Sequence, residues 1–77
     1  MATVFYNYTF EMLVRLERSQ FIDGCLYELG EEPVIVASIT SYDEEMARRR
    51  LVASALESGM VVREIIFQGR IPIAATN

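Results

Sequence analysis

The side chains that could do chemistry in this 77-residue sequence are its carboxylates, its hydroxyls, four tyrosines and one cysteine, Cys25. All seven basic residues are arginine, and the sequence contains neither lysine nor histidine. Histidine is the usual proton shuttle and metal ligand near neutral pH, whereas arginine stays protonated and cannot act as a base. A zinc site built around one thiol without histidine would be unusual. We therefore expect no catalytic residue, no metal site and no cofactor, and we predict that the protein is not an enzyme.

Pairs of acidic residues are the remaining candidates for acid–base catalysis. Glu31-Glu32 lies in an expected turn and Asp43-Glu44 at an expected helix start, so neither pair has the burial that would raise a carboxyl pKa. The thiol of Cys25 has no basic neighbour in the sequence, and we expect it to be buried and unreactive. The four glycines are isolated and form no phosphate-binding motif.

Composition sets limits on the class of protein. A hydrophobic fraction of 52% is typical of a globular chain, and residues 1–77 are expected to form one domain. A core of this size supplies only about 3–5 kcal/mol, so a homodimer or a larger protein partner would complete the burial. The net charge of −4 opposes general affinity for nucleic acid. No apolar run is long enough for a membrane helix, and a lone cysteine without a visible export signal predicts a cytoplasmic protein.

The clearest structural signal is the alternation of residues 4–16. The even positions read Val, Tyr, Tyr, Phe, Met, Val and Leu, and most odd positions are polar. Such a period of two predicts a β-strand with one buried face, and its length predicts a bulge, a bend or a projecting end.

Residues 19–30 admit two interpretations. The apolar residues from Phe21 to Leu29 fall within one helical arc, which favours a short helix over about 20–29 that begins at Ser19 and ends before Gly30. Against the helix, Asp23-Gly24 is a dipeptide typical of hairpin turns, and an internal glycine costs about 1 kcal/mol.

The remainder predicts strand, helix and strand. Residues 34–39 read as a buried strand, and a long helix is expected over about 42–58. Ser41 and Glu44 have the spacing of a capping box, and Gly59 is expected to stop the helix.

A third strand is expected over 60–68, broken by Gly69 before a short edge strand over 70–73 that contains a proline. The predicted fold class is α+β, a three- to four-stranded sheet covered on one face by the long helix. The strand–helix–strand block also permits a right-handed crossover between parallel strands.

The surplus of apolar surface on the long helix predicts where a partner binds. Its second half is apolar around most of its circumference, although a helix over a small sheet needs a single apolar stripe. Aromatic residues at the start of the first strand would be natural contact anchors if that end projects beyond the sheet. The predicted protein-binding residues are Phe5, Tyr6, Tyr8, Met46, Arg49, Ala53 and Leu56.

These observations predict a non-enzymatic protein-interaction module, an adaptor or small inhibitor that acts by occupying a partner surface. Size alone suggests a phage or mobile-element gene. One alternative is a nucleic-acid binder that combines Arg48–Arg50, Arg63 and Arg70 with the strand aromatics. However, the three consecutive arginines lie about 100° apart on a helix, and acids precede two of them by one turn. Another alternative is an acidic mimic of nucleic acid.

Overall fold

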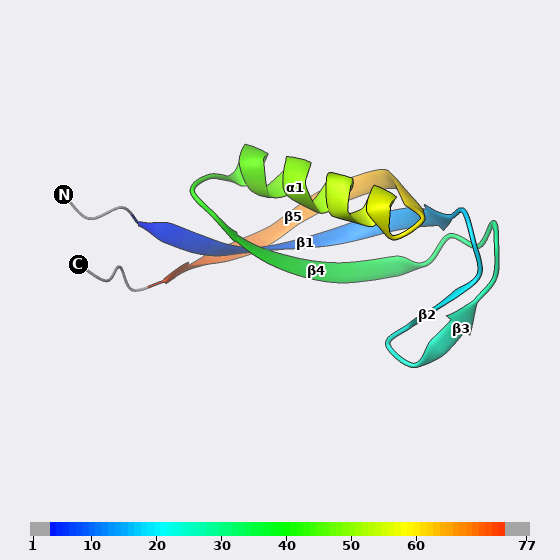
Figure 1. Ribbon diagram of the computed structural model, residues 1–77. Helices are drawn as coiled ribbons and strands as arrows, with labels where there is room; N and C mark the ends of the chain where they lie inside the picture. The colour runs from blue at the N-terminus through cyan, green and yellow to red at the C-terminus, as the bar shows by residue number, and fades with distance from the viewer. Residues whose placement is uncertain (1–3, 74–77) are drawn as a thin grey trace.

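The computed structural model describes residues 4–73, which form an α+β fold with one helix on one face of a small sheet (Figure 1). The elements, in chain order, are β1 Phe5–Leu16, β2 Gln20–Ile22, β3 Cys25–Tyr27, β4 Val34–Ser41, α1 Glu44–Glu57 and β5 Met60–Ile73. The main sheet has three antiparallel strands in the order β4-β1-β5, and β2 and β3 form a separate hairpin. The two outer strands, β4 and β5, are both antiparallel to β1 and so run parallel to each other. The helix α1 crosses over from one to the other, and β1 lies between them in the sheet.

The alternating first strand is confirmed and lies at the centre of the sheet. Its even-numbered side chains face α1 and form most of the core; the buried ones are Tyr8, Phe10, Met12, Val14 and Leu16. The pairing of β1 with β5 shifts register twice, and the extra residues of β5 are Arg63 and Gln68. The length of the first strand predicted a bulge, a bend or a projecting end, and the two bulges occur in its pairing with β5, with the extra residue on β5 in each case.

The predicted long helix is also confirmed, with a different N-cap. Asp43, rather than Ser41, caps α1, because its Oδ1 accepts a hydrogen bond from the Met46 backbone N–H at 2.8 Å. Ser41 is instead the last residue of β4 and is buried. The helix packs on the sheet through Ala47, Leu51 and Ala55. The two alanines are small, so they permit close approach of the helix to the sheet.

The short helix expected over 20–29 is wrong, since these residues form the β2–β3 hairpin, which stands apart from the main sheet in Figure 1. Asp23 and Gly24 both have positive φ, 51° and 81°, as a tight type I′ turn requires. In the hairpin, the apolar residues that suggested a helix point to different sides. Ile22 and Tyr27 pack against the core, and Phe21 is exposed. Cys25 is exposed in β3, so the expectation of a buried thiol is wrong too.

The break expected at Gly69 is also wrong, because β5 continues without interruption to Ile73. Gly69 lies opposite Thr9, directly after the bulged Gln68, where a residue without a side chain fits an irregular ladder. Pro72 is tolerated because β5 is an edge strand. The outcome is a sheet much longer than its helix: 14 helical residues span about 21 Å, and the molecule extends 47 × 22 × 20 Å.

Gly59, which ends α1, provides a first testable prediction. Its φ is +79°, and an added Cβ would lie 2.8 Å from Arg18 Nε. Gly24 has a similar φ of +81° but open space around it. Gly59→Ala is therefore expected to destabilise the fold by about 1–2 kcal/mol, and Gly24→Ala by less. Urea unfolding of both variants measures the difference, and equal losses would contradict a role for the Arg18 contact.

Candidate protein-binding surfaces

The outer face of α1 contains four of the seven predicted contact residues. At 100° per residue, Met46, Arg49, Ala53 and Leu56 lie within an arc of about 80°. The buried face, centred on Leu51, points in the opposite direction towards the sheet. All four outer residues are exposed. We call this set the outer face of α1; its apolar members are not needed to cover the sheet.

A groove adjoins this face where α1 meets β5. It has a volume of about 350 Å³ and is lined almost entirely by apolar atoms of Arg48, Arg49, Val52, Ala53, Leu56 and Ile65. Its helical residues form two rows spaced by four positions, 48–52–56 and 49–53. Rows of this spacing are the ridges between which a second helix packs. Three predicted contact residues, Arg49, Ala53 and Leu56, therefore line one groove.

Arg48 forms a fixed wall of this groove. Its Nη1 donates to the Ile65 carbonyl at 3.0 Å, and its Nη2 donates to Glu44 Oε2 at 2.8 Å. Its guanidinium also lies 5.2 Å from the centre of the Phe10 ring, a distance suited to a cation–π contact. With the guanidinium held at three points, the aliphatic stem of Arg48 presents a stable apolar surface to the groove.

Sequence reasoning missed two residues of the groove. Val52 was not among the predicted contact residues, yet it is exposed and lines the groove beside Ile65 of β5. Ile65 was assigned only to a strand. The i, i+4 relation between Val52 and Leu56 was visible in the sequence, but the pairing of this flank with β5 is set by the tertiary packing.

The strand aromatics do not form a surface with the helix residues. Tyr8 is 1% exposed and lies between the rings of Tyr6 and Phe10, so it belongs to the core and cannot contact a partner. Tyr6 lies beneath the guanidinium of Arg70 at 4.0 Å. An interaction of Arg70 with the Tyr8 side chain is the main cause that raises the pKa of Arg70.

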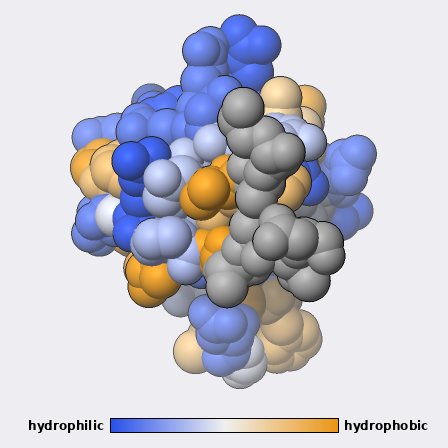
Figure 2. All heavy atoms as spheres, turned by 90° about the vertical axis from the view of Figure 1, so that its left-hand side faces the viewer, coloured by the Kyte–Doolittle hydropathy of each residue, from blue (hydrophilic) through white to orange (hydrophobic). Residues whose placement is uncertain are grey.

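Phe5 lies on the other side of β1, against Tyr42 at 4.7 Å between ring centres. The view from this end of the molecule, where β1 begins and β5 ends, has hydrophobic side chains among hydrophilic ones (Figure 2). The exposed apolar residues there include Tyr42, Ile71 and Ile73. Phe5 and Tyr6 therefore point to opposite sides of the sheet and do not act as one anchor.

The arginines are dispersed, as the helical geometry predicted for the run 48–50. Arg49 pairs with Glu45 at 2.8 Å, and Arg50 donates instead to the Thr40 carbonyl on the opposite flank of α1. Away from the helix, Arg63 pairs with Glu32 at 2.8 Å. Each of these guanidinium groups has its own partner, so they offer little of the continuous positive surface on which nucleic-acid binding depends.

Within residues 4–73, no group of three or more acidic or cysteine side chains is arranged to hold a metal ion. The described part of the chain also has no helix of the length and apolar character needed to cross a membrane. Comparisons with protein-family models, with curated proteins and with solved structures found no match to the chain.

Proposed function

We propose that this protein is a non-enzymatic interaction module, an adaptor or small inhibitor, that binds a partner protein through the outer face of α1 and its groove. The observation that carries the proposal is the apolar groove between α1 and β5. Leu56, which is 65% exposed, lines it together with Val52 and Ile65. Exposed apolar groups that do not contribute to the core are typical of contact surfaces.

The occupant that we propose is an amphipathic helix of a different protein. Two parallel rows spaced by four residues leave a channel that accepts a ridge of large apolar side chains. Ala53 lies between the larger Arg49 and Leu56, so a partner helix could approach the backbone closely at that point. Glu44 and Glu45 neutralise Arg48 and Arg49. Affinity should therefore come mainly from apolar burial and depend little on salt.

A pair of leucine substitutions tests this proposal. Leu56→Asp places a charge in the groove, whereas Leu29→Asp places one at an equally exposed site, 64%, in the loop after β3. Both variants should keep the circular dichroism spectrum of the natural chain. In affinity capture from the source organism, Leu56→Asp is expected to lose the partner that the natural chain and Leu29→Asp retain. The captured protein must then bind when purified.

Light scattering during size-exclusion chromatography measures the oligomeric state of the same three proteins. A monomer in every case agrees with a heterologous partner. A homodimer that only Leu56→Asp dissociates would mean that a second copy occupies the groove. Loss of the partner by both variants, or by neither, would contradict the proposal. The cytoplasmic setting and the phage or mobile-element origin stay predictions.

A further inference from the structure

The face of the main sheet opposite to α1, which we call the open face, is also unusually apolar. An antiparallel sheet with one solvated face normally carries polar side chains on it. Here Val34, Val36 and Ile66 are exposed, and Val36 is 68% exposed. Leu13 lies at the centre of the same face, directly opposite Val34 on β4. Neither the hairpin nor α1 covers these residues, since both pack elsewhere.

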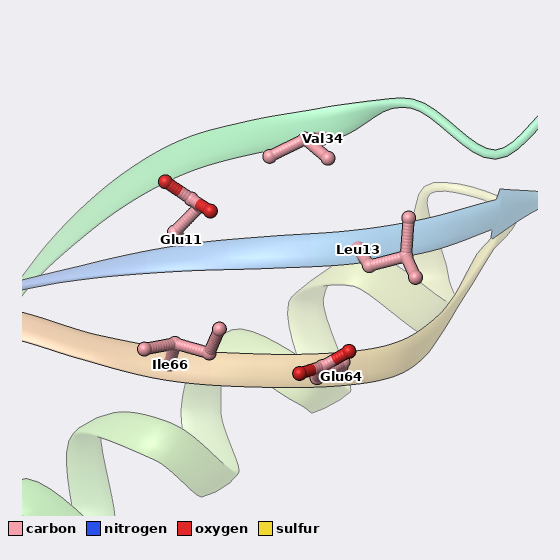
Figure 3. Close-up of a pocket in the computed structure, with 5 residues that line it drawn as sticks. All are labelled: Glu11, Leu13, Val34, Glu64 and Ile66. Carbon is pink, nitrogen blue, oxygen red and sulfur yellow. The ribbon is translucent and has the colours of Figure 1, made fainter.

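Two carboxylates border this apolar surface. Glu11 of β1 and Glu64 of β5 line a shallow pocket of about 130 Å³ together with Leu13, Val34 and Ile66. Figure 3 shows the five side chains on the three strands, with α1 behind the sheet. The register explains the arrangement, because Glu11 lies opposite Ile66 and Leu13 lies opposite Glu64. The two acids thus stand on different strands on either side of one apolar strip.

Neither carboxylate has an ion-pair partner among the described residues. The neighbouring Arg63 binds Glu32 instead. The nearest other cation on this face is Arg15, which follows Leu13 by two positions on β1 and lies opposite Val61. Glu11 is moreover half-buried. This arrangement is unlike that on α1, where Glu44 and Glu45 each have an arginine.

We propose that the open face binds a cationic, aliphatic segment of a second partner protein, in which lysine or arginine alternates with valine, leucine or isoleucine. The aliphatic side chains would cover Leu13, Val34 and Ile66, and the cations would reach Glu11 and Glu64. The complementarity of charge identifies the occupant, because acids outnumber bases on this face and in the whole chain, whose net charge is −4. The open face and the groove lie on opposite sides of the sheet, so a module that uses both would bridge two proteins.

A second copy of this chain is a poorer occupant. Two open faces packed together would bring four carboxylates of the Glu11 and Glu64 type into one interface. They would meet only two guanidinium groups, those of Arg15. Like charges placed together in an apolar contact oppose association. This inference rests on the open face alone and stands independently of the groove on α1.

The experiment uses a synthetic eight-residue peptide in which lysine alternates with valine, acetylated and amidated at its ends. Titration of the isotope-labelled chain, followed by ¹H–¹⁵N NMR, locates the contact. The largest shifts are expected in residues 11–13, 34–36 and 64–66. A peptide with glutamate in place of lysine, and one with serine in place of valine, should not bind. Shifts confined to α1 or spread evenly over the surface would overturn the proposal.

Two double variants separate a specific site from general attraction. Glu11→Gln with Glu64→Gln is expected to weaken binding on the order of tenfold, as the loss of two ion pairs accessible to solvent implies. The control, Glu17→Gln with Glu57→Gln, removes the same charge from exposed positions elsewhere and should change the affinity less than about twofold. Equal weakening in both would mean only general electrostatic attraction. A homodimer that Val36→Asp dissociates would assign the face to a second copy, and either outcome overturns the proposal.

Discussion

Phe10→Ala is expected to reduce the free energy of unfolding by about 3–5 kcal/mol. Phe10 lies at the centre of β1 and is 0% exposed. Its ring contacts Phe67 at 5.7 Å between centres and supports the guanidinium of Arg48. Removal of the ring leaves a cavity at the point where α1 and the sheet meet. For a chain of this length, whose total stability is only about 4–12 kcal/mol, such a loss is a large part of the whole.

Phe21→Ala is the matched control for this prediction. It deletes the same ring at a position that is 72% exposed, on the β2–β3 hairpin opposite Leu26. Its expected cost is within about 0.5 kcal/mol. Thermal unfolding should give a midpoint lower by roughly 15 °C or more for Phe10→Ala, with little change for Phe21→Ala. Similar midpoints for the two variants would contradict the assignment of the core.

Two alanines of α1 give the second large contrast. Ala47 is fully buried against the sheet, and Ala53 lies on the outer face, six positions further along the helix. Ala47→Leu inserts three carbons into the buried contact between α1 and the sheet, and overpacking of this kind costs about 1–3 kcal/mol. Ala53→Leu adds the same atoms in solvent, where leucine is a good helix former, so stability should stay within about 0.5 kcal/mol.

The variant that loses less stability, Ala53→Leu, should lose more affinity in a binding assay. Ala53→Leu fills the place where a partner helix would approach the backbone, so affinity for the proposed partner should fall although the fold is intact. Ala47→Leu should still bind at temperatures where it remains folded. Urea unfolding and the affinity of the purified partner measure the two effects separately. If Ala53→Leu both folds and binds normally, the contact does not pass over Ala53.

The outcome on the hairpin shows where local sequence is insufficient. Phe21, Ile22, Leu26 and their neighbours satisfy a helical arc and a two-stranded hairpin equally well. Asp23 and Gly24 adopt the positive φ values that a tight turn requires. The contact of Tyr27 with the core holds the hairpin in place. Burial of one residue and exposure of the next is a tertiary property. Cys25 was misplaced for the same reason.

By contrast, β1 could be predicted because a period of two runs through it, and α1 because residues typical of a helix start precede it and Gly59 follows it. The outer face of α1 followed from its surplus of apolar residues, since a helix on a small sheet buries a single stripe and the rest must point away. The groove could not be predicted, because the sequence alone does not show that Val52 of the helix lies next to Ile65 of β5. The continuation of β5 through Gly69 and Pro72 likewise depends on the partner strand β1, whose ladder supports residues that weaken an isolated strand.

The central claim is that the outer face of α1 and its groove bind a partner protein, and calorimetric titration of the purified partner tests it most directly. Leu56→Asp is expected to raise the dissociation constant by at least about 30-fold, as loss of a contact hot spot implies. Leu29→Asp should leave it unchanged. Equal affinities of the natural chain and Leu56→Asp, with both folded, would contradict the claim.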